Sequence, residues 1–324
     1  VTGRLSCNKP NLQQIPRGDT AIAATIKKMF VAPKGKLILQ IDYAQAELRV
    51  MAEAANETTM IGWFRDEKDI HTASACKKYK EDYEKVIKIL KDEKHPDYKL
   101  WKKRRKQAKT INFGIIFCQM AKKLAQSLSE PAAYDDNNKK IFKGIIVTKE
   151  EAQQFLNSFN KDFPKVGKFM RSQKILARDQ GYVKTFFGRK RRLPNIYSST
   201  DGIRMEAERQ SINAPIQGTA SDFAFFSSIL IREKILKNEL PNYIKQIYTV
   251  HDSLGFIIKP EDIHKAVHII KNICENPQTQ RWFGFKMKKV RMAVDFEIGK
   301  NWGELSKYNS KNDYGKLLIN KSSK

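Results

Sequence analysis

The pattern of apolar and polar residues divides the chain into short strand-like runs and longer helical stretches. The apolar run 36–42 is bounded by proline and glycine and ends in Asp42, which predicts a buried strand with a carboxylate at its end. Residues 45–55 then follow a helical period, and helix formers dominate 61–109. The first third of the chain is therefore expected to place one strand ahead of several helices.

Helical and hairpin patterns also mark the second half of the chain. Residues 181–192 predict a small hairpin with a basic tip, and 135–144 predict a polar insertion loop. A helical pattern over 201–214 should stop or kink at Pro215, because proline has no N–H to donate, and resume over 218–231.

The C-terminal third predicts a second carboxylate at the end of a strand. The runs 246–250 and 254–258 flank a short turn, which predicts a tight hairpin with Asp252 at its tip. The basic C-terminal tail, 306–324, is polar and is expected to fray.

Composition points to a polyanionic partner. The 324 residues include 61 Lys plus Arg against 35 Asp plus Glu, a formal net charge of +26. No apolar run approaches the ~18 residues that a membrane span needs, so we expect no membrane partner and favour nucleic acid. The four cysteines lie far apart without a C-x-x-C pair, so neither a zinc site nor a disulfide framework is indicated.

Two cations and two aromatic residues recur every four positions. A helix over this segment would align Arg105, Lys109, Phe113 and Phe117 along one face. Cations at the N-terminal end of that helix, where backbone N–H groups also point outward, suit a polyphosphate, and the aromatic end suits a sugar and a base. The alternative is a basic surface patch that runs into a buried aromatic helix.

The two strand-end carboxylates form a candidate metal site. Asp42 and Asp252 could together hold two Mg²⁺ ions ~3.5–4 Å apart, the spacing used in phosphoryl transfer. Alternatively, both are solvated turn residues. The chain lacks G-x-x-x-x-G-K-[ST], G-x-G-x-x-G and H-E-x-x-H, which argues against a P-loop nucleotidase, a dehydrogenase and a zinc hydrolase.

Six segments, in this order, resemble family A DNA polymerases, the bacterial polymerase I type. Three match the polymerase motifs of the family and three match the stretches that precede the first and last motifs; the segments are 2–6, 10–16, 42–49, 105–117, 209–220 and 250–253. The resemblance spans nearly the whole chain.

This resemblance implies a template-directed DNA polymerase that adds deoxynucleotides to a primer 3′ end by two-metal phosphoryl transfer. Asp42, Asp252 and the backbone of Tyr43 would bind two Mg²⁺ ions. Arg105 and Lys109 would hold the incoming triphosphate, and Lys109 would protonate the departing pyrophosphate. The catalytic residues implied are therefore Asp42, Asp252 and Lys109.

The resemblance also implies contacts to the nucleotide sugar and to DNA. Glu47 matches a steric gate that excludes the ribose 2′-OH, and Phe113 implies poor use of nucleotides that lack a 3′-OH. The nucleotide-binding set is Arg105, Lys109, Phe113, Phe117, Glu47, Gln45 and Tyr43. The DNA-binding set is Arg4, Asn11, Gln13, Arg209, Asn213, Gln217 and His251, for which helix caps and core hydrogen bonds are the alternative.

Three positions depart from the family pattern. Ser253 replaces the acid that usually follows Asp252, so two aspartates must suffice. Phe117 stands where Tyr is usual, and Cys118 where Gly is usual. Separately, Asp295 and Glu297 resemble the D-x-E of an exonuclease, but their segment matches the C-terminal strand of the family.

The implied fold is α/β (α+β). Residues 1–55 and 205–324 would form a palm with an antiparallel sheet, and 56–204 mostly helical fingers, whose 105–117 helix swings onto bound nucleotide. Because the chain begins inside the family pattern, the thumb and a possible exonuclease domain of the same polypeptide are expected upstream. The protein is expected to be monomeric.

Two rival functions and two rival sources remain open. A single-subunit RNA polymerase would not be expected to keep Glu47, and a non-catalytic DNA-binding module would explain the charge but not the paired aspartates. The Lys and Asn bias favours an organellar enzyme of DNA replication or repair, in an apicoplast or other plastid of a protist. A bacterial or phage polymerase is the alternative.

Overall fold

The computed structural model describes residues 3–9, 11–15, 21–129, 133–134, 140–142, 144–250 and 252–318. The α-helices are α1 (Ala21–Lys28), α2 (Ala46–Ala55), α3 (Thr58–Arg65), α4 (Ile70–Tyr79), α5 (Tyr83–Lys91), α6 (Tyr98–Ile116), α7 (Ala121–Leu128), α8 (Lys149–Asp162), α9 (Pro164–Gln180), α10 (Asp201–Leu236), α11 (Ile263–Glu275) and α12 (Thr279–Phe283). The strands are β1 (Leu37–Tyr43), β2 (Ala133–Tyr134), β3 (Lys140–Phe142), β4 (Tyr182–Lys184), β5 (Lys190–Arg192), β6 (Lys245–Val250), β7 (Ser253–Ile258), β8 (Val294–Gly299) and β9 (Ser306–Lys307). Short 3₁₀ helices are η1 (Leu12–Gln14), η2 (Pro194–Tyr197), η3 (Pro260–Asp262) and η4 (Tyr314–Leu317).

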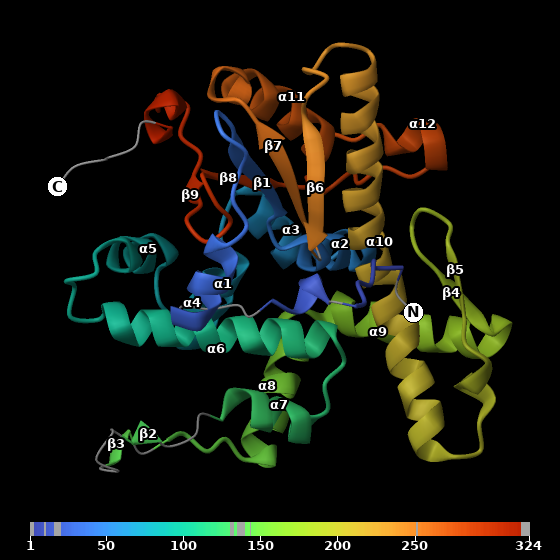
Figure 1. Cartoon of the computed structure of the whole chain (residues 1–324). Coiled ribbons are helices and arrows are strands. Elements are labelled where there is room, and N and C mark those ends of the chain that lie inside the picture. Colours follow the sequence, from blue (N-terminus) through green and yellow to red (C-terminus); the bar gives the residue numbers. More distant parts are fainter. Residues whose placement is uncertain are drawn as a thin grey trace.

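The main sheet joins the two ends of the chain. Its five strands run in the order β6-β7-β1-β8-β9, and every neighbouring pair is antiparallel. β1, from the N-terminal part, lies between β7 and β8 from the C-terminal part (Figure 1). The predicted α/β class with an antiparallel sheet is confirmed, as are the hairpins β4–β5 and β6–β7.

The two faces of β1 have different environments. Leu37, Leu39, Ile41 and Tyr43 alternate along the strand and are at most 2% exposed. The Tyr43 hydroxyl hydrogen-bonds Ser227 of α10 at 2.7 Å and the main-chain carbonyl at the end of α11 at 3.3 Å. The apolar face of the sheet therefore packs on α10 and α11, which leaves the alternate residues, including Asp42, on the opposite face.

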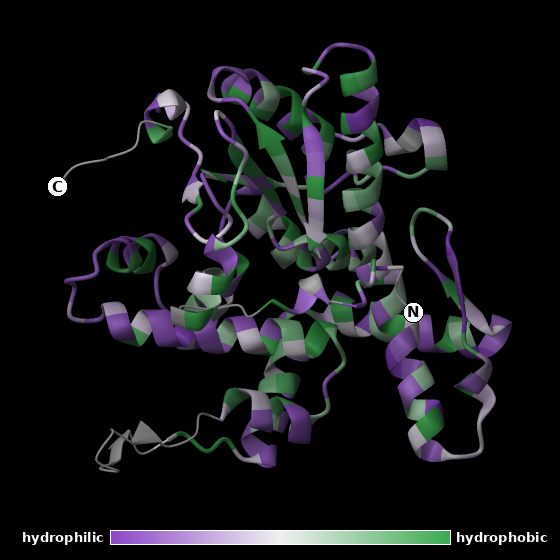
Figure 2. Cartoon of the chain, viewed as in Figure 1, coloured by the Kyte–Doolittle hydropathy of each residue, from purple (hydrophilic) through white to green (hydrophobic). Residues whose placement is uncertain are grey.

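The segment between β1 and β6 is mostly helical, with only short two-stranded hairpins. α4, α5 and α6 share a small second hydrophobic cluster around Val86 and Trp101. Hydrophobic residues are dense in β7 and hydrophilic residues are frequent along α6 (Figure 2). The division into a palm of 1–55 and 205–324 with fingers of 56–204 stays a prediction. Among the described residues, no helix combines the length and hydrophobicity required to cross a membrane.

Three predictions about secondary structure need correction. α10 does not stop at Pro215, because Ala214 and Ile216 are buried on either side and this packing offsets one missing backbone hydrogen bond. Residues 306–318 are ordered where fraying was predicted: they include β9 and η4, and Tyr314 is buried, whereas 319–324 lie outside the described part. The predicted loop 135–144 contains β3, and its remaining residues except Gly144 lie outside the described part.

Candidate active site

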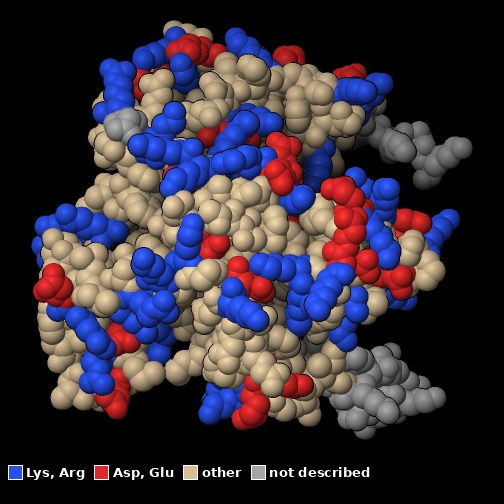
Figure 3. Space-filling view, turned by 180° about the vertical axis from the view of Figure 1, so that it is seen from behind, with Lys and Arg blue, Asp and Glu red and all other residues tan. Residues whose placement is uncertain are grey.

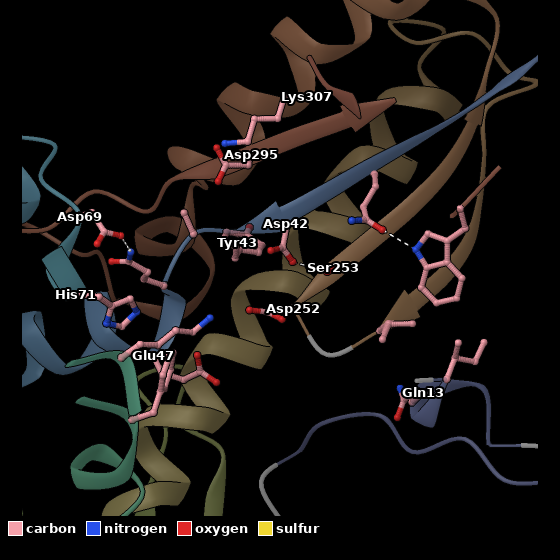
Figure 4. Close-up of a pocket in the computed structure, with 18 of the residues that line it drawn as sticks. Gln13, Asp42, Tyr43, Glu47, Asp69, His71, Asp252, Ser253, Asp295 and Lys307 are labelled. Atoms are coloured by element: carbon pink, nitrogen blue, oxygen red, sulfur yellow. Dashed lines mark hydrogen bonds between the residues drawn. The ribbon is translucent and has the colours of Figure 1, made fainter. Parts of the chain in front are cut away.

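A cavity of about 820 Å³ opens on the polar face of the sheet and faces α6 (Figure 4). It is lined by side chains from both ends of the chain and from the helical segment between them. The predicted site residues that it brings together are Gln13, Asp42, Tyr43, Gln45, Glu47, Arg105, Lys109, Phe113, Phe117 and Asp252.

Strand pairing brings the two predicted aspartates to one end of the cavity. Asp42 lies opposite Ser253 in the β1–β7 pair, and the Tyr43 N–H donates to the Asp252 carbonyl at 3.3 Å. The Ser253 hydroxyl donates a hydrogen bond to the Asp42 carboxylate. Asp295, which the sequence placed only in a C-terminal strand, lies opposite Asp42 on β8 and also lines the cavity.

The donor atoms at this end suit a hard divalent cation. Burial raises the pKa of the Glu297 carboxyl, and the nearby Asp42 carboxylate raises it further although Lys307 opposes the shift. Carboxylates therefore lie near one another on this face of the sheet, and carboxylate oxygens suit a hard divalent cation. The described residues place no three His, Cys, Asp or Glu side chains around one point, so a metal ion here would need backbone, substrate or water oxygens as well.

Tyr43 contributes its backbone to the cavity. Its ring is 2% exposed and its hydroxyl is bonded within the core, as described above. The side chain therefore fixes the end of β1, and the main chain beside Asp42 remains at the cavity surface. This placement is compatible with the predicted backbone ligand.

α6 carries the predicted stripe of cations and rings, with one correction. The helix begins at Tyr98, so Arg105 and Lys109 lie in its middle and their backbone N–H groups belong to the helix ladder. The prediction that free N–H groups at a helix N-terminus assist these cations is wrong. The side chains alone supply the positive charge, and Arg105 and Lys109 both line the cavity.

Asp69, which sequence reasoning missed, holds the cationic end of the cavity. Its carboxylate accepts two hydrogen bonds from the Arg105 guanidinium, at 3.1 and 2.9 Å, and one from Gln45 at 3.0 Å. It also caps α4 by accepting from the Thr72 N–H at 2.7 Å. Burial alone would raise the pKa of this carboxyl, but the Arg105 hydrogen bonds and charge and the Thr72 hydrogen bonds hold it below its ordinary value.

His71 is a second cavity residue that the sequence did not reveal. Asn112 Nδ2 lies 3.2 Å from His71 Nδ1, and because an amide nitrogen only donates, the ring proton is placed on Nε2. Burial lowers the pKa of His71 to about 4, although the Asp69 carboxylate opposes the shift. The ring is therefore neutral at pH 7 and offers one N–H donor. The only local pattern near His71 was the Asp-x-x-Thr cap from Asp69 to Thr72, which marks the start of α4 but does not indicate a cavity residue.

The aromatic end of the stripe forms a stacked pair. The rings of Phe113 and Phe117 have centroids 5.7 Å apart and an interplanar angle of 22°, and His71 lies 5.5 Å from Phe113. α6 ends at Ile116, so Phe117 is its C-terminal cap residue. Asn213 of α10 donates to the Phe117 carbonyl at 3.3 Å, which fixes the end of the helix.

Glu47 lies in the first turn of α2 and is 6% exposed. Its carboxylate pairs with the guanidinium of Arg4. A solvated helix carboxylate is therefore excluded. The burial and the position at the cavity wall give this side chain a fixed location.

The predicted DNA-binding residues do not all face the cavity. Gln13 lines it and donates to the Thr249 carbonyl at 3.4 Å. Asn11 accepts from the Gln13 N–H at 3.1 Å, the capping role left open above. Arg209 pairs with Glu206 on α10. Arg4 is paired with Glu47, and Asn213 is hydrogen-bonded to the Phe117 carbonyl. Gln217 is half-buried on α10, and His251 lies outside the described residues.

Comparisons with known proteins give a consistent family. The sequence profile described as DNA polymerase family A matches residues 1–304. The chain is 33% identical to DNA polymerase I of Rhizobium leguminosarum, with 94% of this chain and 26% of that protein covered. It is also 33% identical to the DNA polymerase of Bacillus phage SP01, with 94% of this chain and 31% of that protein covered.

A solved structure resembles the fold as well as the sequence. The polymerase domain of Pol1 from M. smegmatis, in complex with DNA primer-template and dNTP, superposes with a TM-score of 0.75 at 27% identity. The match covers 93% of this chain and 46% of that one. The chain thus spans less than half of the solved relative and about a quarter to a third of the curated relatives named above.

Proposed function

Since this chain belongs to DNA polymerase family A, we propose that it catalyses template-directed addition of deoxynucleotides to the 3′ end of a primer. The observation that carries the proposal is the single cavity of about 820 Å³ that contains both the strand-end aspartates and the α6 stripe. These groups are far apart in sequence: the pairing of β1 with β7 brings the two aspartates together, and α6 lines the same cavity.

The α6 side of the cavity would hold the nucleotide. Arg105 and Lys109 bring two positive charges to the triphosphate, and the neutral His71 donates from Nε2 to a phosphate oxygen. Lys109 would donate a proton to the departing pyrophosphate. The Phe113 and Phe117 rings would pack against the sugar and the base.

The sheet side of the cavity would hold the reacting atoms. Asp42, Asp252 and the backbone of Tyr43 present hard oxygen donors that fit Mg²⁺, and two such ions would stabilise the attacking and leaving oxygens when bound. Ser253 would orient the Asp42 carboxylate through its hydrogen bond. Because this residue is neutral, the metal site would rest on two aspartates.

The remaining predicted residues support selection and DNA contact. Glu47, buried at the cavity wall, would exclude a 2′-OH. Arg4, Gln13, Arg209 and Gln217 would contact the primer, the template or the new base pair, where side-chain donors check pair shape through the minor groove. α6 would close onto the nucleotide, with Arg105 leaving Asp69 for the triphosphate.

Organellar replication or repair, in an apicoplast or other plastid, remains a proposal that rests on composition alone. Imaging of a tagged protein in its native cell would test it, and a signal confined to the nucleus or cytosol would contradict it.

Two other functions make different predictions from the same residues. A single-subunit RNA polymerase would accept ribonucleotides despite the buried Glu47. A DNA-binding module without catalysis would bind primer-template and leave the primer unchanged.

Primer extension in the full-length protein separates these functions. With one deoxynucleotide supplied at a time and Mg²⁺ present, we expect extension only by the nucleotide complementary to the next template base. Extension by ribonucleotides at equal efficiency, or binding without extension, would contradict the proposal.

A further inference from the structure

A second cavity, of about 620 Å³, lies on the other side of the sheet. We call it the rear groove; its charged lining residues are Glu275, Arg281, Lys286, Lys288, Lys289 and Arg291. It is also lined by residues of α10 and α11, the helices that cover the face of β1 opposite Asp42. The two cavities share no lining residue.

The rear groove is strongly cationic. Five of its lining residues are Lys or Arg, and Glu275 is its single lining carboxylate, already paired with Arg291. Among the described residues, no carboxylate forms an ion pair with Arg281, Lys286 or Lys288. In the view from behind, Lys and Arg side chains gather in a band over the upper half of the molecule (Figure 3). Such a concentration of positive charge around one lining carboxylate favours a polyanionic ligand.

The backbone beneath these cations is held in place. The Glu53 carboxylate accepts hydrogen bonds from the N–H groups of Lys288, Lys289 and Val290 at 3.0, 2.9 and 2.9 Å. Val290 is 2% exposed. Because the main chain is fixed from the α2 side, the lysine side chains project from an ordered edge, which lowers the entropic cost of binding.

Aromatic residues lie beside the cations. Trp282 is 59% exposed and Phe283 is 44% exposed, although both are large apolar side chains. The Phe283 ring packs on Phe187 with centroids 4.8 Å apart and on Phe226 with centroids 5.2 Å apart, which anchors the end of α12 next to Trp282. The Trp282 indole has an Arg281 guanidinium 5.7 Å from its ring. Exposed rings interleaved with cations are typical of surfaces that bind unpaired bases and their phosphates.

We propose that the rear groove binds single-stranded nucleic acid, outside the active-site cavity. Arg281, Lys286 and Lys288 contact successive phosphates, and a base stacks on Trp282. Duplex DNA fits less well because its bases are already paired and stacked. An acidic peptide would use the same cations but has no base to stack on the exposed indole.

Binding of a fluorescent oligothymidylate of about 12 nucleotides tests this proposal. The active-site cleft of the full-length protein is first saturated with an unlabelled primer-template hairpin, so that the remaining binding reports other surfaces. The variants are Trp282→Ala and the triple variant Arg281→Gln/Lys286→Gln/Lys288→Gln. The control Lys88→Gln/Lys91→Gln/Lys94→Gln removes the same charge from exposed positions on and just after α5.

We expect both rear-groove variants to weaken oligothymidylate binding and the control to leave it unchanged. Loss of three phosphate contacts should make the slope of log affinity against log salt shallower by about 2. Trp282→Ala should lower affinity by about 5- to 150-fold. Primer extension on the hairpin should be unaffected in both rear-groove variants. A failure of the rear-groove proposal can therefore be told apart from a failure of the proposed polymerase activity.

Crosslinking supplies a readout in the unmodified protein. With 5-bromouracil in the oligonucleotide, irradiation should attach it to the peptide that contains Trp282. Crosslinks confined to peptides of the active-site cavity, an unchanged salt slope in the triple variant, or an equal loss in the control would each overturn the proposal. Displacement by polyglutamate, together with unchanged affinity of Trp282→Ala, would identify an acidic-peptide surface instead.

Discussion

Replacing Glu47 with Ala should allow the protein to incorporate ribonucleotides. Glu47 is 6% exposed and lines the cavity where the sugar would lie, so a 2′-OH beside it would overlap a fixed side chain. Forcing extra atoms into a packed site costs about 1–3 kcal/mol. At about 1.4 kcal/mol for each factor of ten, Glu47→Ala should reduce discrimination against ribonucleotides by roughly 5- to 150-fold.

The Glu47 carboxylate also forms an ion pair with Arg4, and the effect of losing this pair must be separated from the effect of losing the steric gate. Arg4 keeps 32% of its side chain exposed but Glu47 only 8%, so removing Arg4 leaves a buried carboxylate without its partner and should cost about 1–3 kcal/mol of folding free energy. Arg4→Met removes the pair and keeps the gate. Glu47→Gln keeps the size of the gate and removes its charge.

The assay compares kcat/KM for a deoxynucleotide and its ribonucleotide at one template position. We expect Arg4→Met and Glu47→Gln to retain most of the discrimination. Unchanged discrimination in Glu47→Ala, or equal loss in Arg4→Met, would refute the steric argument.

Three further predictions follow from the α6 side of the cavity. Lys109→Ala should raise the KM for nucleotide by about tenfold or more, because a charge-assisted phosphate contact is lost. Lys103→Ala on the same helix should leave the KM unchanged, and equal kinetics of the two variants would contradict a role of Lys109 in nucleotide binding. Asp69→Ala should lower the free energy of unfolding by about 2 kcal/mol, because it removes both the N-terminal cap of α4 and the ion pair with Arg105. A denaturant midpoint equal to that of the unmodified protein would contradict this loss of stability. Burial lowers the pKa of His71 from 6.5 to about 4, so the unfolded chain takes up a proton before the folded protein does as the pH falls below 6.5. The free energy of unfolding should therefore drop by up to about 3 kcal/mol toward pH 4. A His71→Asn variant with the same pH dependence would contradict the lowered pKa of His71.

Local patterns were sufficient for the elements that carry the site. Short apolar runs bounded by turn residues located β1 and the β6–β7 hairpin, so the two aspartates could be placed at strand ends from the sequence. Four-residue spacing located the stripe on α6. Their meeting in one cavity followed from the family resemblance, because no local pattern specifies that β1 pairs with β7.

The residues that sequence reasoning missed act through long-range contacts. Asp69 pairs with Arg105, 36 positions later, and its local signature is an ordinary helix cap. The start of α6 was misjudged because helix formers continue without interruption ahead of Arg105, so the pattern contains no boundary there. Pro215 was read as a break because proline loses a hydrogen bond, yet burial on both sides keeps α10 continuous.

Asp42 and Asp252 would form one reaction centre, in the cavity that α6 also lines. The most direct measurement is primer extension and primer-template binding by Asp42→Ala and Asp252→Ala in the full-length protein, with the exposed Asp179→Ala as control. We expect each active-site variant to lose at least about a thousandfold in extension rate while binding of primer-template is largely retained. Extension at the control rate by either variant would contradict a shared reaction centre at Asp42 and Asp252.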